Sequence, residues 1–254
     1  MRLNKALATA GVCSRRKADE LVFAGKVAVN GVTATSPGMQ VTPGEDIVTV
    51  YGKPVAFLPQ GQEVIEHSYY LLNKPVEVVT TASDPQGRRT VLDILPEAIR
   101  KRRVFPVGRL DYFSEGLLLL TSDGNLTYRL THPKYHLPKV YEILVRGEVT
   151  QAKLETMRAG MTLAEGEKLA PVGVKVLDRK MFGKTLLGMT LTQGVNRQIR
   201  RMCRDLELTV LKLRRTREGP LSLGDLPLGQ VRALTSTEIK ALLQAVELEA
   251  RGAG

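Results

Sequence analysis

The chain has 254 residues, with 37 Lys and Arg against 26 Asp and Glu, so its formal net charge is +11 and its isoelectric point is near 9.8. A chain of this length can bury a substantial core in one large domain or two ordinary ones, and its charge favours a polyanionic partner such as RNA. No segment approaches the roughly 20 apolar residues that span a bilayer, and no signal peptide opens the chain, so we expect a cytoplasmic protein without membrane contacts. Cys13 and Cys203 lack metal-ligand spacing, and we expect two reduced thiols that pack as small apolar side chains.

The first part of the chain predicts a compact domain over residues 1–60. Apolar positions recur at helical spacing over residues 2–10 and 14–24, and a glycine ends each run. Residues 26–34 alternate around an Asn-Gly pair, which is typical of a hairpin with a type I′ turn. A further strand is predicted over 46–50, so two short helices and a small sheet make up this domain.

Three consecutive cations, Arg15, Arg16 and Lys17, occupy the first turn of the second predicted helix. Each is opposed there by the helix dipole, at a cost of about 0.3 to 1 kcal/mol. Backbone amides and cations at one helix end suit a phosphate of RNA. The alternative is a solvated charged face with no ligand.

A second domain is predicted over residues 67–248, after a linker at about 54–66 that contains proline, glycine and polar residues. Its elements are mixed and rich in strands, and no βαβ phosphate-binding fingerprint occurs, which favours an α+β fold. The expected strands are 69–73, 78–81, 104–107, 117–121, 140–146, 172–178, 185–192 and 208–215. A capping box, Thr235-Ser236-Thr237-Glu238, predicts a closing amphipathic helix.

The most informative segment is residues 108–121, Gly-Arg-Leu-Asp-Tyr-Phe-Ser-Glu-Gly-Leu-Leu-Leu-Leu-Thr. The four leucines predict a strand that is covered on both faces, which places Asp111 at the mouth of a rigid core element. Rigid support of this kind favours a catalytic carboxylate. The alternative is that Asp111 caps a turn and pairs with Arg109.

This segment resembles the signature of the pseudouridine synthases that modify ribosomal RNA, which reads Gly-Arg-Leu-Asp, two residues, Ser or Thr, one residue, then Gly and a Leu-rich run. The family's second motif, a lysine and a tyrosine that open a strand, is similar to Lys139-Val140-Tyr141, and its third to Gly194-Val195-Asn196-Arg197-Gln198-Ile199-Arg200-Arg201-Met202. The N-terminal domain resembles the S4 RNA-binding fold, and the likeness covers about residues 1–240. Ser114 stands where threonine is common in the family, and Ser122 where asparagine is frequent.

The resemblance implies a small S4-type domain followed by a catalytic domain with a mixed, mostly antiparallel sheet and a central cleft. It implies that Asp111 is the nucleophile and that Arg200 keeps it oriented and charged. Tyr141 would be the platform on which a flipped uracil stacks, although a tyrosine in a strand is also an ordinary core residue. Arg109 either competes for the partner role or, as we favour, contacts phosphate.

RNA contacts are expected from residues near the motifs and from the first helix turn of the S4-type domain, namely Lys74, Arg109, Lys139, Asn196, Arg197, Arg201, Arg15, Arg16 and Lys17. Further basic clusters occur at Arg88, Arg89, Arg100, Lys101, Arg102 and Arg103, and within 195–217 at Arg197, Arg200, Arg201, Arg204, Lys212, Arg214, Arg215 and Arg217. They are interpreted as an RNA track whose affinity falls steeply with salt. The alternative is an ordinary soluble surface.

Conversion of uridine to its C-glycoside is redox-neutral and needs no cofactor, and we expect no metal, because His67, His132 and His136 offer at best two ligands. The expected function is isomerisation of one uridine in ribosomal RNA, with large-subunit RNA favoured over small-subunit RNA. Naked RNA or a ribosomal precursor particle is the expected partner of a monomeric enzyme. A non-catalytic S4-type assembly factor is the alternative, and an RNA phosphodiesterase is disfavoured by the lack of a metal cluster.

Overall fold

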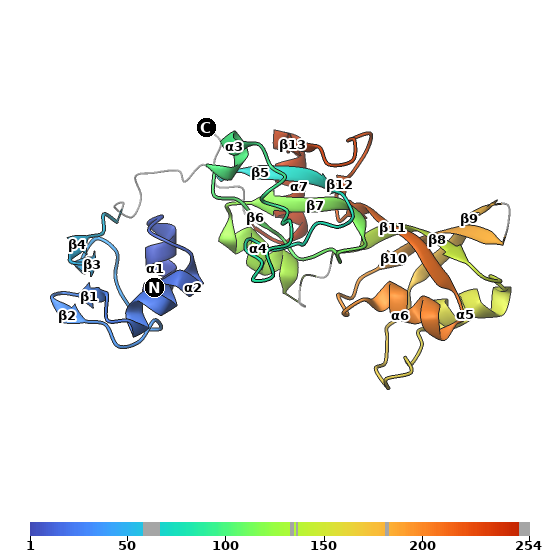
Figure 1. The fold of residues 1–254 in the computed structure, drawn as a ribbon, viewed down its shortest axis with the longest axis horizontal. Coiled ribbons are helices and arrows are strands. Elements are labelled where there is room, and N and C mark those ends of the chain that lie inside the picture. The colour runs from blue at the N-terminus through green and yellow to red at the C-terminus, as the bar shows by residue number, and fades with distance from the viewer. Residues whose placement is uncertain (58–66, 133–134, 136, 181–182, 249–254) are drawn as a thin grey trace. The chain divides into compact units, whose positions relative to one another are not determined.

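The computed structural model describes residues 1–57, 67–132, 135, 137–180 and 183–248, of which Lys180 is described for its backbone alone. The chain divides into two compact units, Met1–Glu66 and His67–Gly254 (Figure 1). Most of the expected linker lies outside the described residues, as does His136. The expected limits of the two domains therefore stay a prediction.

Two helices packed on a four-stranded sheet make up the first unit. The helices are α1 (Leu3–Thr9) and α2 (Arg15–Phe23), and the strands, in sheet order, are β2 (Val32–Thr33), β1 (Val27–Val29), β3 (Val48–Val50) and β4 (Lys53–Pro54). Asn30 and Gly31, between β1 and β2, have φ of 51° and 81°. Both values suit a type I′ turn, and the predicted helices and hairpin are confirmed. Apolar side chains from both helices and from β1 and β3 form one core.

The second unit is built on a nine-stranded mixed sheet, and the predicted α+β class with mostly antiparallel pairing is confirmed. Seven strands follow one another across it in the order β13 (Val231–Ala233), β5 (Tyr69–Lys74), β7 (Glu115–Thr121), β11 (Thr209–Glu218), β8 (Lys139–Arg146), β10 (Lys184–Leu191) and β9 (Gly173–Lys180). Short strands β6 (Phe105–Pro106) and β12 (Leu221–Ser222) pair with β7 and β11. Among the strands of the described residues, β7 and β11 alone pair in parallel.

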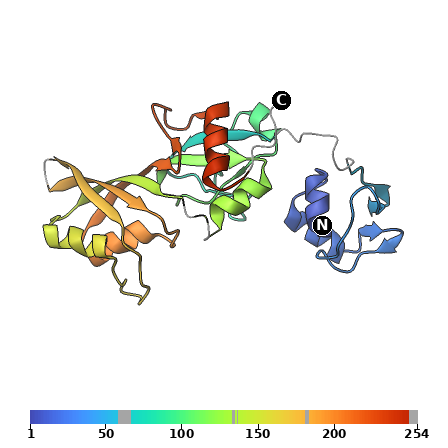
Figure 2. The ribbon, with the colours of Figure 1, turned by 180° about the vertical axis from the view of Figure 1, so that it is seen from behind.

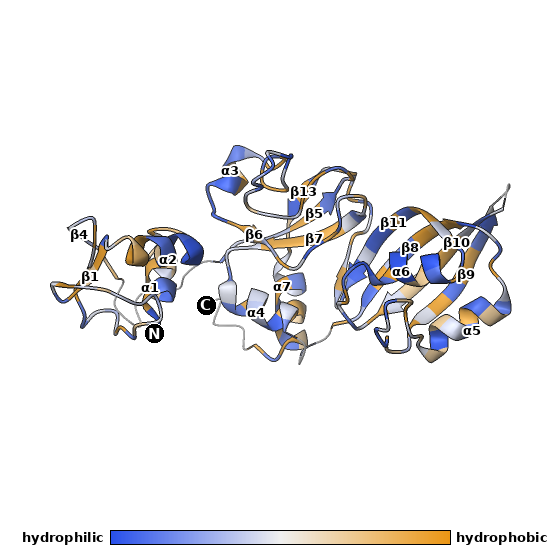
Figure 3. Ribbon diagram, turned by 60° about the horizontal axis from the view of Figure 1, so that its bottom comes forward, coloured by the Kyte–Doolittle hydropathy of each residue, from blue (hydrophilic) through white to orange (hydrophobic). Residues whose placement is uncertain are grey.

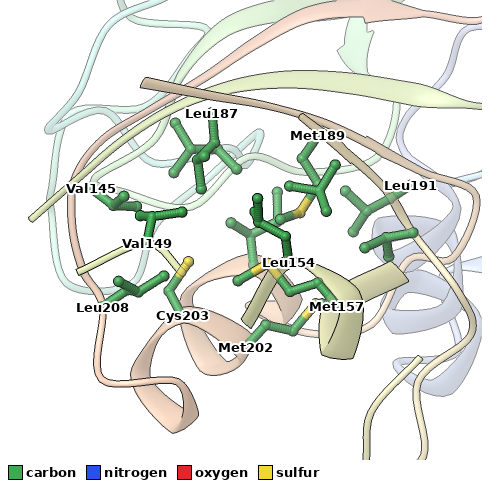
Figure 4. Packing of buried hydrophobic residues seen from close by; sticks show 14 of the residues in the cluster. Val145, Val149, Leu154, Met157, Leu187, Met189, Leu191, Met202, Cys203 and Leu208 are labelled. Atoms are coloured by element: carbon green, nitrogen blue, oxygen red, sulfur yellow. The ribbon is translucent and has the colours of Figure 1, made fainter. Parts of the chain in front are cut away.

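Helices cover this sheet in two places. The unit's helices are α3 (Glu97–Arg100), α4 (Gly124–Thr131), α5 (Gln151–Ala159), α6 (Gln198–Asp205) and α7 (Ser236–Ala245). Figure 2 shows α4 and α7 in front of β5 and β7, whereas α5 and α6 lie against the strands β8 to β11. The core beneath α5 and α6 contains Met202 and Cys203 of α6 together with Leu187 and Met189 of β10 (Figure 4). The predicted closing helix is confirmed as α7, with its capping box formed at Thr235.

Strand β7 is buried along its whole length, as the leucine run predicts, and Figure 3 shows most of it as hydrophobic. Leu117 and Leu119 enter the core shared with α4 and α7, and Leu118 and Leu120 enter a second core on the opposite face. Each fully buried leucine contributes about 1.5 to 3 kcal/mol relative to an exposed one. The strand is therefore a firm support for the residues that precede it.

One predicted strand, residues 78–81, is wrong. Val79 forms an isolated bridge with Thr90, while Val78 has no regular structure and Thr80 and Thr81 lie in a bend. The β-branched residues of this segment favoured an extended conformation, and Val78 is indeed buried in a core. No neighbouring strand continues the pairing beyond that bridge within the described residues, so burial there does not produce a ladder.

Candidate active site

Asp111 lies in a tight turn immediately before β7. The amide of Ser114 donates to the carbonyl oxygen of Asp111 at 3.0 Å and closes the turn. Because β7 begins at Glu115 and is fully buried, the turn stands at the edge of the core. The Asp111 side chain is 38% exposed, so its carboxylate is open to a substrate while its backbone is fixed.

Lys74, at the end of β5, fixes that backbone. It is fully buried, and its Nζ donates to the carbonyl oxygens of Pro75, Ser114 and Asp111 at 2.8, 2.9 and 3.2 Å. Burial lowers the pKa of Lys74 to about 8. The expected RNA contact of Lys74 is corrected: this side chain is enclosed by protein and holds both ends of the Asp111 turn.

Arg200, in the first turn of α6, is the charged partner of Asp111. Its Nε lies 3.9 Å from Oδ2 of the carboxylate, and one terminal nitrogen donates to the carbonyl oxygen of Phe113 at 2.7 Å and to Ser114 Oγ at 3.3 Å. The guanidinium therefore contacts both the turn and its carboxylate. Ser114, noted above as a departure from threonine, supplies the hydroxyl in this contact.

Tyr141, on β8, is half-buried and packs against the cores on both sides of the site. Burial raises the pKa of the Tyr141 hydroxyl, and the charge of Asp111 raises it further, which places the two residues within electrostatic reach. The structure thus brings Asp111, in the turn before β7, next to Arg200 of α6, and places Tyr141 on β8 within electrostatic reach of Asp111. Their chemical roles stay predictions.

Beneath Tyr141 lies a buried ion pair that sequence reasoning did not identify. Arg215 on β11 is paired with Tyr141 across the sheet, hydrogen-bonds its side chain, and donates from Nε to the carbonyl oxygen of Leu117 at 2.8 Å. A terminal nitrogen of Arg215 lies 3.3 Å from Glu218 Oε2, and these side chains are 2% and 8% exposed. The assignment of Arg215 to a surface RNA track is therefore corrected.

The contact between β7 and β11 requires glycine at position 116. Gly116 has φ of 109°, and a Cβ there would lie 2.2 Å from the carbonyl oxygen of Arg215. Both the left-handed conformation and the close approach of the two backbones exclude a side chain. This approach brings the Arg215 guanidinium next to the start of β7, where it donates to Leu117.

Two other expected RNA contacts are engaged within the protein. Lys139 is 17% exposed, and its Nζ lies 3.7 Å from Glu218 Oε1. Arg201 is 19% exposed and pairs with Glu167 at 2.7 Å and with Glu165 at 3.1 Å. Both cations are compensated by carboxylates of the protein, and their expected contacts with RNA stay predictions.

The remaining expected RNA contacts lie on the surface of their own units. Arg109, Asn196 and Arg197 are exposed on the second unit, and Arg197 is the N-cap of α6 with φ of 50°. On the other unit, exposed cations occupy the first turn of α2, namely Arg15, Arg16 and Lys17. Of these, Lys17 pairs with Glu20 at 2.7 Å.

Within the described residues, no three His, Cys, Asp or Glu side chains are grouped so that they could hold a metal ion. The same residues contain no helix that is long and apolar enough to cross a membrane.

Comparison with known proteins gives matches over both units. A family model for RNA pseudouridylate synthase matches residues 68–205, and a model for the S4 domain matches residues 1–47. An uncharacterized RNA pseudouridine synthase of Aquifex aeolicus is 42% identical over 251 residues, which cover 98% of this chain and 96% of the relative. Ribosomal large subunit pseudouridine synthase B of Bacillus subtilis is 41% identical, with 95% of each chain covered.

Two further relatives agree with this result. A dual-specificity RNA pseudouridine synthase of Escherichia coli is 38% identical, over 97% of this chain and 80% of the relative. The crystal structure of a pseudouridylate synthase superposes with a TM-score of 0.67 and 27% identity, and covers 95% of this chain and 99% of that one.

Proposed function

We propose, from the premise that this chain belongs to the RNA pseudouridylate synthase family, that it converts one uridine of ribosomal RNA to pseudouridine with Asp111 as the nucleophile. The family makes the chain an RNA pseudouridine synthase and disfavours the non-catalytic assembly factor. The observation that carries the role of Asp111 is its position: a partly exposed carboxylate on a fixed turn, 3.9 Å from the Arg200 guanidinium. Ribosomal RNA, and large-subunit RNA in particular, is inferred from the name of the relative in Bacillus subtilis.

The reaction breaks the bond between C1′ of the ribose and N1 of uracil and forms a bond between C1′ and C5. The proton on C5 leaves, N1 gains a proton, and no electrons are exchanged with a cofactor. Asp111 can serve in two ways, by addition to the uracil ring or by assistance to the departure of the base from the ribose. In both ways the guanidinium of Arg200, 3.9 Å from the carboxylate, would keep the carboxylate oriented towards the substrate.

Tyr141 is proposed as the platform for the extruded base. Its ring lies at the site between two apolar cores, and its hydroxyl is held from below by Arg215. A flat face is needed because the uracil leaves its stack, which costs a few kcal/mol, and needs a replacement surface. We therefore infer a preference for loops and poorly paired uridines.

Recognition of RNA is assigned to the exposed polar residues around the site and to the S4-type unit. Arg109 and Arg197 are exposed cations next to the catalytic residues in the chain, and the first turn of α2 offers Arg15 and Arg16. These residues suit phosphate contacts, which position a substrate without specifying its sequence. A cytoplasmic location is part of the proposal, because ribosomal RNA is there.

The test is chemical derivatisation of pseudouridine followed by primer extension on ribosomal RNA from cells that lack the protein. One stop should vanish from the RNA of these cells. It should return with the wild-type chain but not with Asp111→Asn, which keeps the size of the side chain and removes its charge. An unchanged set of stops, or full restoration by Asp111→Asn, would refute the proposed function or the proposed nucleophile, respectively.

A further inference from the structure

An exposed aromatic side chain adjoins the nucleophile. Phe113 is 60% exposed, although it lies only two residues from Asp111. Its ring meets the edge of the Tyr112 ring, with centroids 5.0 Å apart and planes at 83°, while the rest of the ring faces solvent. Neither residue belongs to the family signature quoted above, which leaves both positions open. The site thus carries an apolar surface that the proposed mechanism does not use.

The backbone beneath this ring is fixed. The amide of Glu77 donates to the carbonyl oxygen of Tyr112 at 2.8 Å, and Arg200 donates to that of Phe113 at 2.7 Å. The turn's two end carbonyls are held by the buried lysine of β5. The backbone that carries the ring is therefore set when the protein folds, and a ligand that binds the ring has little backbone order left to impose.

The ligand chemistry follows from the place of the ring. A uridine that reaches Asp111 brings its neighbouring nucleotides to the same turn, and extrusion of the uridine leaves the face of a neighbouring base without a stacking partner. Aromatic side chains stack on bases of any sequence because every base has a flat π face. Arg109, exposed on the other side of Asp111 in the chain, adds a cation for the connecting phosphate.

We propose that Phe113 is a base-stacking site: its ring packs on the nucleotide next to the target uridine and holds the RNA strand while the uridine is extruded. The inference rests on the proposed function. A single exposed apolar residue on a protein surface needs no ligand. The proposal therefore requires a comparison with an exposed aromatic residue that lies away from the site. Tyr128 on α4 provides the comparison, because it is 62% exposed and lies beyond the opposite end of β7.

The substrate is ribosomal RNA isolated from cells that lack the protein and were grown with uridine tritiated at C5. The experiment measures the tritium that each purified variant releases from this RNA, since the reaction displaces the hydrogen on C5. Phe113→Ala should lower kcat/KM about tenfold, within the range that loss of one base stack produces. Phe113→Leu keeps apolar bulk without a π face, so its kcat/KM should be as low as that of Phe113→Ala. Phe113→Trp should have the kcat/KM of the wild type. Tyr128→Ala should match the wild type.

A second measurement follows the stack itself. An RNA oligonucleotide that spans the site mapped by primer extension carries 2-aminopurine next to the target uridine. Its fluorescence should be quenched by the wild-type chain and by Phe113→Trp but not by Phe113→Ala or Phe113→Leu. The thermal midpoints of the wild type and the Phe113 variants should coincide, because the ring is mostly exposed. With equal stability, a purely structural role of the ring would change neither kcat/KM nor the quenching.

Two failures are distinguishable. A wild-type chain that releases no tritium refutes the proposed function. A wild-type chain that releases tritium, together with Phe113→Ala of equal kcat/KM and equal quenching, refutes the stacking site alone. Activity of Phe113→Leu at the wild-type level would also overturn it, because the ring would then act only as apolar bulk.

Discussion

The two sides of the active site are stabilised in different ways. On the Asp111 side, a partly exposed carboxylate faces a partly exposed guanidinium, and the turn is held through its carbonyl oxygens. On the Tyr141 side, the support is an ion pair between Arg215 and Glu218 that is almost wholly excluded from water. Exposure leaves the charge of Asp111 available to a substrate, whereas burial makes Arg215 a fixed hydrogen-bond donor. We therefore expect the chemistry of the site to depend on Arg200 and the positioning of Tyr141 to depend on Arg215.

The largest expected effect is on the exposed side. Arg200→Ala removes the charge beside Asp111 and two hydrogen bonds to its turn, so kcat should fall about 10³-fold, which corresponds to about 4 kcal/mol. Lys74 still holds the turn, and the free energy of unfolding should change by less than about 1 kcal/mol. Tritium release and urea denaturation measure the two quantities. Arg200→Lys keeps the charge and loses the planar fork, so its kcat should lie between those of the wild type and Arg200→Ala.

Retention of wild-type kcat by Arg200→Ala would exclude the arginine as the charged partner. Arg109→Ala is the matched control, because Arg109 is a second arginine close to Asp111, two residues away in the chain, and its side chain is exposed. We expect it to raise KM and leave kcat nearly unchanged, as loss of a phosphate contact does.

On the buried side, the expected effect is on stability first. Arg215→Met leaves Glu218 in the core with only Lys139 nearby, at 3.7 Å, and should lower the free energy of unfolding by about 3 to 5 kcal/mol. Adding Glu218→Leu should restore most of that stability, because an apolar pair replaces the ion pair. Turnover should stay low in the double variant, since the Tyr141 hydroxyl has lost its donor.

This double variant separates positioning from folding. If it recovers both stability and kcat, Arg215 supports the fold and does not position Tyr141. Tyr141→Phe gives the reference for loss of the hydroxyl alone, and the double variant should not fall below it once the fold is restored.

Lys74 provides a smaller effect that depends on pH. Burial lowers the pKa of Lys74 to about 8 from 10.5 in the unfolded chain, so the unfolded state binds more protons between these values. The stability of the wild type should therefore rise with pH across that window, by up to about 3 kcal/mol, and the cost of burying the charge is fully present below pH 8. Other groups also titrate there, and the difference from Lys74→Met isolates this one.

Urea denaturation at intervals between pH 7.5 and 10.5 tests this prediction. The stability of the wild type, relative to that of Lys74→Met, should increase as the pH rises. A difference that stays constant over the window would show that folding does not lower the pKa of Lys74, because the three carbonyl oxygens fully compensate the cost of burying its charge.

Much of this architecture is predictable from local patterns. The Asn-Gly hairpin, the capping box of α7 and the buried strand at residues 117–120 each follow from a few adjacent residues. The buried charges do not. Arg214 and Arg215 are consecutive in the chain, and only the parallel pairing of β11 with β7, remote in sequence, decides which of the two is enclosed. The burial of Lys74 could not be predicted for the same reason, because its three carbonyl partners come together only in the folded sheet.

Ion pairs around α6 explain another difference between the sequence and the structure. Arg201 and Arg204 belong to a basic run, which suggests an RNA surface. Three acceptors compensate them: Glu165 and Glu167, from the loop after α5, and Asp205 beside them. No local pattern relates that loop to α6, since the pairs join residues more than thirty positions apart in most cases. The effective positive charge of this surface is therefore smaller than the sequence suggests.

The smallest expected effect comes from releasing that charge. Glu165→Gln with Glu167→Gln should free Arg201 for phosphate, strengthen RNA binding a few-fold at low salt, and steepen the dependence of log K on log salt by about one unit. Partly exposed ion pairs contribute only about 0 to 1 kcal/mol each, so the fold should tolerate the change. Glu148→Gln with Glu155→Gln is the control for net charge alone, because it also removes two exposed carboxylates, neither of which pairs with a cation among the described residues. Filter binding over a salt series measures both slopes. Equal slopes for the double variant and the control would show that Arg201 stays away from RNA even when it is released, and that its ion pairs serve to hold the loop after α5 against α6.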